Sequence, residues 1–247
     1  MAGSFLATLA VAQPRPLYTI TNLGSALPAG WSSQATVVSN TGTVTGVAIA
    51  PDGTQHAVVW AEGWIFDISQ PALGGPNSGA GGVNSRGQIV GQAESSDIDP
   101  YHENFCGYGT GRTCLPFRWE RGRMTSLETL GGNNGAAGPI NRRGQASGIA
   151  ENSTPDPECT LGVAVNGTGP QVLDYEAVIW EREHNRPREL RPLIGDTVGM
   201  ALWINDNGEA VGISGSCANT ILPPIAVGPH AVLWDAGGSP HDLGSLG

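Results

Sequence analysis

The chain has 247 residues, a formal net charge of −10 and 39 % hydrophobic residues. The hydrophobic content excludes a disordered chain, and the length suffices for one all-β domain with its own core, rich in turns because it holds 37 glycines and 18 prolines. The negative charge argues against nucleic acid as a partner, because phosphate backbones are bound by clustered lysine and arginine.

Residues 1–16 are interpreted as the remnant of a secretory signal or as a disordered tail. A short apolar run extends from Phe5 to Ala12, and Ala10-Val11-Ala12 offers a small-x-small cleavage site, although the basic segment of a signal is missing. No other stretch approaches the roughly 20 apolar residues that cross a bilayer, so no membrane span is predicted. A secreted or periplasmic location follows.

Residues 17–247 are predicted to form a single β domain built of repeats. Residues 17–30 look like the fourth strand of a repeat that lacks its first three strands, and four repeats follow at about 31–75, 76–132, 133–196 and 197–247. Because the last repeat already has its own fourth strand, the chain would contain five fourth strands but only four of each other strand, and one blade would be incomplete. We therefore expect that the natural chain continues with further repeats.

Each repeat is anchored on a four-residue turn that begins with Asn or Ser and ends with glycine, at Gly42, Gly87, Gly144 and Gly208. Asn or Ser at the first position can bond the backbone two residues later, and glycine at the fourth tolerates a positive φ. Two antiparallel strands should therefore flank each turn, with helix confined to the N-terminus and the insertions.

A second glycine follows each turn glycine after four residues, at Gly46, Gly91, Gly148 and Gly212. Glycine inside a strand indicates a close backbone approach. Each repeat then continues with an apolar third strand that ends in tryptophan, and with a short fourth strand. The shared register of Trp60, Trp119, Trp180 and Trp234 favours core packing over sugar stacking, whereas Trp64 lies outside it and is the better candidate for an exposed aromatic.

Four short strands per unit, with turn glycines recurring after 45, 57 and 64 residues, predict an all-β fold of four-stranded blades arranged as a partial or small β-propeller. A third strand that is apolar on both faces suits a sheet that is covered on both sides. The segment Gln171 to Arg186 has neither glycine nor proline and could form a helix. We predict a strand there because Trp180 keeps the register of the repeat.

Together these motifs resemble the HAF-type extracellular repeats of bacterial secreted proteins, named for a His-Ala-Phe segment ahead of the tryptophan. That segment stands here as His56-Ala57-Val58 and His230-Ala231-Val232. The resemblance covers about Tyr18 to Gly247 and implies an extracytoplasmic, propeller-like protein without an established activity. The chain departs from the pattern at Leu115 and Glu176, which replace the histidine, so a repeated role for that histidine as a ligand is in doubt.

All four cysteines lie in insertions between second and third strands, which indicates local disulfides in an oxidising compartment. Cys106 and Cys114 should pair, because the seven residues between them include three glycines and can fold back. Cys159 and Cys217 should then pair across adjacent repeats. The spacing of Cys106 and Cys114 does not match a zinc site, and no metal site is predicted.

Three long insertions, about Glu94 to Cys114, Glu151 to Asp174 and Gly215 to Pro229, join second to third strands. In a propeller these connections emerge on one face, and loops on a rigid scaffold often carry recognition. We predict a ligand-binding surface there that is formed by Asp97, Asp99, Tyr101, His102, Tyr108, Asp156 and Glu158. Acidic residues of these loops, Glu94 and Glu103 included, also make a calcium site conceivable, but their spacing matches no known calcium loop.

No catalytic residues are predicted, because the chain lacks a nucleophile elbow or an assignable Ser-His-Asp set. The leading hypothesis is a secreted, non-catalytic module that binds or scaffolds an extracellular ligand, carbohydrate or cell-surface protein, through loops on one face, with no cofactor. The alternative is a secreted propeller hydrolase or lyase that acts on polysaccharide. An enzyme requires three or more ionisable groups that converge near the axis.

Overall fold

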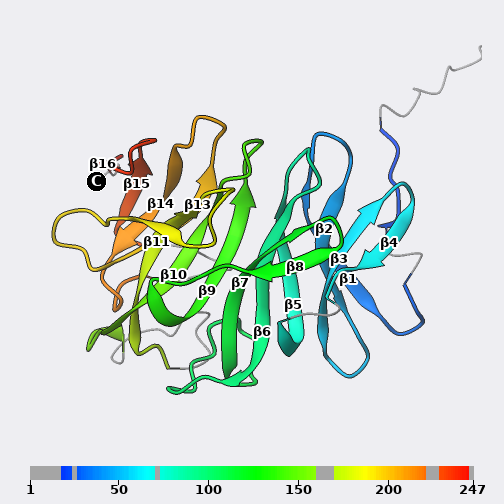
Figure 1. Cartoon of the computed structure of the whole chain (residues 1–247), viewed down its shortest axis with the longest axis horizontal. Helices are drawn as coiled ribbons and strands as arrows, with labels where there is room; N and C mark the ends of the chain where they lie inside the picture. Colours follow the sequence, from blue (N-terminus) through cyan, green and yellow to red (C-terminus); the bar gives the residue numbers. More distant parts are fainter. Residues whose placement is uncertain (1–17, 24–26, 70–72, 160–169, 221–227, 245–247) are drawn as a thin grey trace, which may run out of the picture.

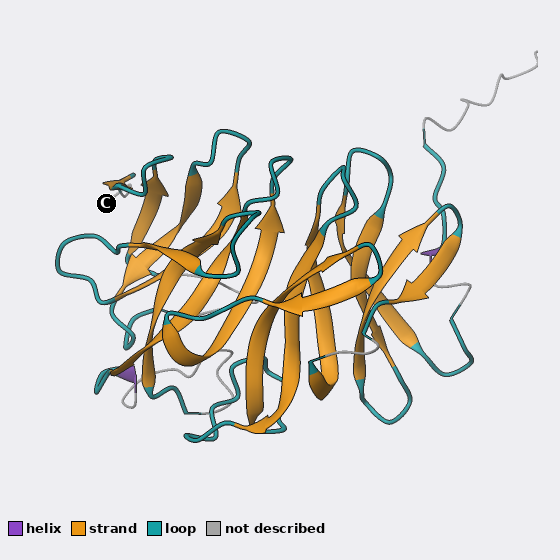
Figure 2. Ribbon diagram, viewed as in Figure 1, coloured by secondary structure: helices purple, strands orange, loops and turns teal. Residues whose placement is uncertain are grey.

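The computed structural model of the chain describes residues 18–23, 27–69, 73–159, 170–220 and 228–244. Over these residues nearly all regular structure is β-strand, as Figure 2 shows. Within these ranges, sixteen strands form four separate four-stranded antiparallel sheets. The sheets are arranged in a ring as the blades of a four-bladed β-propeller (Figure 1), so the predicted fold is confirmed.

Each blade contains four consecutive strands, which we call A to D. The first blade holds β1 (Ser32–Val38), β2 (Val44–Ile49), β3 (Gln55–Ala61) and β4 (Trp64–Asp67), and the second holds β5 (Gly74–Val83), β6 (Ile89–Ile98), β7 (Arg112–Glu120) and β8 (Arg123–Ser126). The third holds β9 (Gly131–Ile140), β10 (Ala146–Pro155), β11 (Leu173–Trp180) and β12 (Pro187–Leu190), and the fourth β13 (Val198–Ile204), β14 (Ala210–Gly215), β15 (His230–Trp234) and β16 (Pro240–Asp242).

The turns between strands A and B lie along one edge of the molecule, the upper edge in Figure 1, and the connections between strands B and C lie along the opposite edge. All four A–B turns form as predicted. The first residue of each turn accepts a backbone hydrogen bond from its glycine, at 3.0 to 3.1 Å, and all four glycines have φ between 73° and 89°. These turns fix the register of the A–B strand pairs.

The second glycines meet the backbone of strand A, as the sequence predicts. A β-carbon on Gly46, Gly91, Gly148 or Gly212 would lie between 1.8 and 2.1 Å from a carbonyl oxygen of strand A. The cause is an irregularity in strand A, which shifts register beside each of these glycines and pushes its backbone toward strand B. Glycine is therefore required here for space, not for a special φ.

The core lies between the blades. One apolar cluster joins the first and second blades, another the second and third, and another the third and fourth. Trp60, Trp180 and Trp234 are at most 5 % exposed, so their predicted role in the core is confirmed, and Trp119 is partly buried beside the first of these clusters. The indole nitrogens of Trp180 and Trp234 donate to backbone carbonyls just after strand D of the preceding blade, at 2.9 and 2.7 Å.

The segment ahead of the first blade differs from its prediction. Residues 18–22 are irregular and form no strand, so the predicted fourth strand at residues 17–30 is absent from the described part of that segment. Leu23, Leu27 and Trp31 nevertheless pack on the outer face of the first blade, and the indole nitrogen of Trp60 donates to the carbonyl of Leu23 at 2.8 Å. The predicted signal remnant at residues 1–16 lies outside the described residues.

Both predicted disulfides form, between Cys106 and Cys114 and between Cys159 and Cys217, with Cα–Cα distances of 5.5 and 4.8 Å. They are compatible with an oxidising, extracytoplasmic compartment. The segment that could have formed a helix contains the strand β11, as the repeat register requires. Among the described residues, no helix has the length and apolar character needed to span a bilayer.

Candidate functional site

The candidate site is a pit of about 380 Å³ at the A–B turn end of the propeller axis, called the axial pit below. All four blades line it with the same four consecutive repeat positions, which end strand A and begin the turn. The first position is filled by Val37, Gly82, Pro139 and Trp203, the second by Val38, Val83, Ile140 and Ile204, the third by Ser39, Asn84, Asn141 and Asn205, and the fourth by Asn40, Ser85, Arg142 and Asp206.

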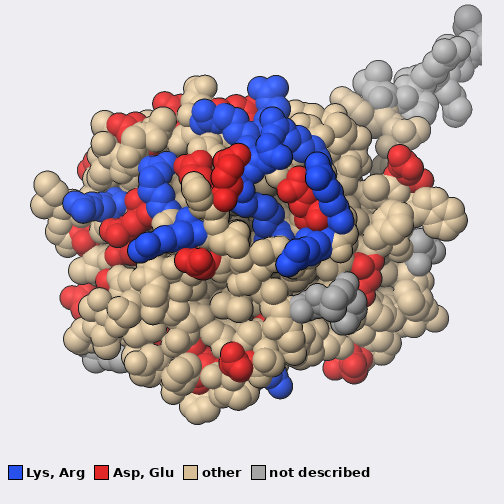
Figure 3. Space-filling view, in the orientation of Figure 1, with Lys and Arg blue, Asp and Glu red and all other residues tan. Residues whose placement is uncertain are grey.

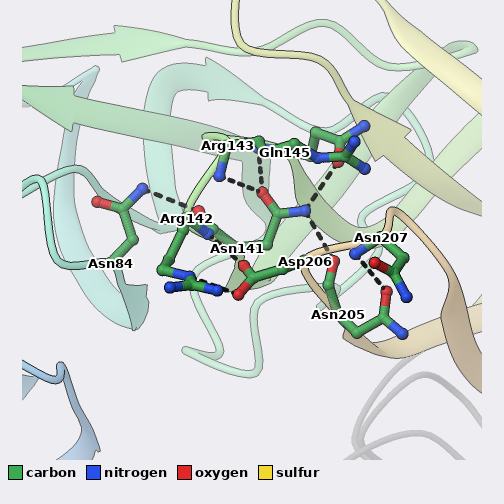
Figure 4. A network of polar contacts seen from close by, with 8 residues as sticks. All are labelled: Asn84, Asn141, Arg142, Arg143, Gln145, Asn205, Asp206 and Asn207. Atoms are coloured by element: carbon green, nitrogen blue, oxygen red, sulfur yellow. Dashed lines mark hydrogen bonds and ion pairs between the residues drawn. The ribbon is translucent and has the colours of Figure 1, made fainter.

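The third position forms a relay of amides that ties neighbouring turns together (Figure 4). Nδ2 of Asn84 donates to the carbonyl of Asn141 at 2.9 Å, and Nδ2 of Asn141 donates to the carbonyl of Asn205 at 2.8 Å. The first two asparagines also donate to the glutamine four residues later in their own turns. Because both hydrogens of these amides are used, the asparagines hold the rim of the axial pit in shape.

The fourth position supplies the polar groups of the rim. Arg142 and Asp206 neutralise each other, because Nε of Arg142 lies 2.5 Å from Oδ2 of Asp206 and the backbone nitrogen of Arg142 donates to Oδ1 at 2.9 Å (Figure 4). These hydrogen bonds hold the pKa of the Asp206 carboxyl below its usual value. Within the described part of the chain, the side chains of Asn40 and Ser85 have no hydrogen-bond partner and are available to a ligand.

The first position breaks the fourfold pattern. Valine, glycine and proline occupy it in the first three blades, whereas the fourth blade places Trp203 there with 59 % of its surface exposed. The second position is apolar in every blade, and Val38 is 65 % exposed. The axial pit thus combines an apolar wall, one accessible indole and a few free hydrogen-bonding groups, which is the composition of a small-molecule binding site.

The residues predicted to bind a ligand lie at the opposite end, on the B–C loops. Asp97, Tyr101, His102 and Glu158 are exposed, so their role in recognition stays a prediction. Asp99, in contrast, is fully buried, and its Oδ1 accepts from two backbone nitrogens of its own loop. Oδ1 of Asp99 therefore shapes the loop, and the side chain is not part of an exposed binding surface.

Tyr108 and Asp156 are also engaged. Tyr108 lines a cavity of about 420 Å³ between the first two blades at the B–C end, and burial raises its pKa to about 12. Asp156 accepts from the backbone nitrogen of Glu158 at 2.8 Å and from the hydroxyl of Thr197 at 3.3 Å. Neither side chain points freely to solvent, so the predicted surface is reduced to its exposed members.

The B–C loops are bound to one another. Oε1 of Glu103 in the second blade accepts from the backbone nitrogens of Val172 and Leu173 in the third, at 2.6 and 3.1 Å. The Cys159–Cys217 disulfide joins the third blade to the fourth, and the described parts of these loops share one buried cluster. The loops therefore gather at one end, as predicted, and fasten three blades together.

Histidine and cysteine give no metal site in the described structure. His56 and His230 instead each bond an aspartate, Asp67 and Asp196, with 2.8 Å between Nδ1 and Oδ2. One group with metal-ligand atoms close together combines Asp156 with Cys159 and Cys217. Its two sulfur atoms form a disulfide with each other and are therefore not thiolate ligands.

Charged side chains are concentrated over the second and third blades (Figure 3). All basic residues other than histidine are arginine, and acidic side chains lie among them in this view. Arg118 is buried and donates to the carbonyls of Arg182, Glu181 and Gly144, so it joins β7 to the β11–β12 turn. The mixture of signs differs from the uniform basic stripe that nucleic acids require.

Sequence reasoning missed Trp203 as a site residue. The sequence does distinguish this residue, because it occupies the position five residues before the turn glycine, where the other repeats have Val, Gly or Pro.

No match to this chain was found among protein-family models, curated proteins or solved structures. The function is therefore inferred from the site alone.

Proposed function

We propose that the protein is a secreted, non-catalytic module that binds a neutral carbohydrate in the axial pit. The observation that carries the proposal is Trp203, the one departure from the pit's fourfold pattern that exposes a large aromatic face. Aromatic faces combine a large apolar area with a rigid ring, and such residues dominate binding energy at protein interfaces. Asn40 and Ser85 are placed to bond the hydroxyl groups of the sugar.

The pit lining favours binding over hydrolysis. Its charged residues are Arg142 and Asp206, and each is the partner of the other. Glycoside hydrolysis generally uses two carboxyl groups with different roles. One neutralised carboxylate does not provide that chemistry, so the alternative of a polysaccharide hydrolase is supported less well than a binding module.

The proposal predicts that Trp203→Ala weakens binding of neutral oligosaccharides at least about tenfold, since an aromatic anchor that the bound ligand covers contributes about 1.4 kcal/mol or more. The measurement is isothermal titration against oligosaccharides of glucose and of N-acetylglucosamine that a glycan array has first shown to bind. Trp64→Ala is the matched control, because Trp64 is 69 % exposed on β4 and lies outside the pit. It should leave the affinity unchanged.

A Tyr101→Ala variant separates the pit from the B–C loops. Tyr101 is 42 % exposed at the opposite end of the molecule, on the surface that the sequence predicts as the working one. If Tyr101→Ala lowers the affinity and Trp203→Ala does not, the ligand binds to the loops and the axial pit is not its site.

A further inference from the structure

A group of buried carboxyls lies at the B–C end, between the second and third blades. We call Asp99, Glu103 and Glu151 the carboxyl cluster. All three are fully buried, and an oxygen of each lies 3.0 to 3.1 Å from one point, the Nδ2 atom of Asn134. They come from separate parts of the chain, the B–C loop of the second blade and β10 of the third, so their convergence is a product of the fold.

Each carboxyl of the cluster accepts two or more hydrogen bonds from backbone nitrogens, but no positive charge balances the group within the described residues. Nδ2 of Asn134 carries two hydrogens, which cannot serve three carboxylate oxygens at equal distance. Backbone nitrogens and Gln171 bond other lone pairs of the group, but among the described residues no arginine or histidine forms an ion pair with any of its members. Buried carboxylates are stable only when they are protonated, paired or bound to a metal.

A second observation points to a ligand. Gln171 is 1 % exposed, and its Nε2 donates to Oε1 of Glu151 at 2.9 Å, so its amide lies against the cluster. Its Oε1 is buried without a hydrogen-bond partner in the described structure. A buried carbonyl-type oxygen without a donor is costly, and a cation would satisfy it.

We propose that the carboxyl cluster is a calcium site, with Asp99, Glu103 and Glu151 as ligands and Oε1 of Gln171 as a further oxygen. An all-oxygen set rich in carboxylates suits calcium, which takes six to eight oxygens at 2.3 to 2.6 Å in flexible geometry. The carboxylate oxygens lie about 0.5 Å farther than this from Nδ2 of Asn134, so modest contraction brings them into range. The ion takes the place of that nitrogen, and the Asn134 side chain turns away at the cost of the 2.8 Å hydrogen bond that its Oδ1 accepts from the backbone nitrogen of Cys114.

Calcium at this position joins two blades. Glu103 accepts hydrogen bonds from the backbone at the start of β11, and Glu151 accepts them from the backbone nitrogens of Asn133 and Asn134 in β9. An ion between them fixes the B–C loop of the second blade onto the third blade, as the Cys159–Cys217 disulfide joins the third blade to the fourth. The inference does not depend on the axial pit, which lies at the other end of the axis.

The test is the melting temperature of the whole chain, stripped with chelator and then titrated with calcium chloride. Ligand at a hundred times its dissociation constant should raise the melting temperature by about 5 °C or more for a domain of this size. Glu151→Gln should abolish most of this shift, and Glu103→Gln is a second variant if the first does not fold. Glu158→Gln, which alters an exposed acid of the neighbouring loop, should retain it.

Three outcomes would overturn the proposal. The first is a melting temperature of the unaltered chain that calcium does not change. The second is a calcium shift that survives in both Glu151→Gln and Glu103→Gln, which places the ion elsewhere. The third is an equal shift with magnesium, since magnesium demands a tighter octahedral site than this cluster offers.

Discussion

Replacing Gly148 by alanine should lower the free energy of unfolding by about 3 kcal/mol or more. The added β-carbon would lie 2.1 Å from the carbonyl oxygen of Ala136 and 3.0 Å from Cζ3 of Trp180. Neither neighbour can give way cheaply, because the oxygen belongs to the paired strand β9 and the indole is fully buried between two blades. The strands must therefore separate locally or the blade interface must open.

Urea denaturation with a constant slope m measures this loss. Gly138→Ala is the matched control, since Gly138 lies in the paired strand β9 and a β-carbon there meets nothing within 4 Å. That substitution should be neutral or stabilising by a few tenths of a kcal/mol to about 1 kcal/mol, through the unfolded chain. Equal stabilities of the two variants would show that the close approach at the second glycine is not what selects glycine.

The same glycines show how far the sequence predicts the fold. Turn glycines and second glycines are four residues apart in every repeat, and this constant spacing predicts the A–B hairpins, the close backbone approach at the second glycine and the blade register. The prediction succeeds because it depends on local geometry repeated four times. The Cys106–Cys114 pair succeeds for a similar reason, since its loop is short and contains three glycines.

The structure of the segment ahead of the first blade could not be predicted in this way. Residues 18–23 have the sequence of a strand but no neighbour in a sheet, so they pack on the first blade through Leu23 without forming one. Strand formation needs a partner strand, and a motif read from one segment does not supply that partner. The error lies in treating a local pattern as sufficient for a non-local structure.

The candidate sites were least predictable. Asp99 and Glu103 were assigned to acidic loops, but Glu151 was missed as their partner although it occupies the same repeat position as Glu94, three residues after the second glycine. Only the three-dimensional contact between blades shows that these carboxyls meet. Trp203 was missed because the A–B turns were treated as uniform, whereas the proposed binding residue stands at the position where one repeat differs.

Glu176 should make the protein less stable as the pH rises. It occupies the repeat position that His56 and His230 fill in the first and fourth blades, and each of those histidines bonds an aspartate. Glu176 is 7 % exposed and its Oε2 is buried without a partner in the described structure. Burial raises its pKa to about 9, and the negative charges of Asp174 and Glu189 contribute.

The direction of the effect follows from proton counting. The unfolded chain loses this proton near pH 4.3, whereas the folded chain holds it to about pH 9, so the folded state binds the extra proton between these values. The contribution of Glu176 protonation to the free energy of unfolding is fully present below about pH 4.3. It falls by about 1.4 kcal/mol per pH unit as the pH rises toward 9. At pH 8 the accumulated loss is on the order of 3 to 5 kcal/mol.

Glu176→Gln keeps the size of the side chain and removes the ionisation. It should therefore raise the free energy of unfolding by a few kcal/mol at pH 8 and have little effect at pH 4, where glutamate is mostly neutral in both states. Urea denaturation of both proteins at the two pH values measures the difference. Glu183→Gln is the control, because Glu183 is exposed on the β11–β12 turn of the same blade. If Glu176→Gln gains no more stability at pH 8 than Glu183→Gln, Glu176 ionises in the folded protein without cost and finds a partner that this structure does not assign.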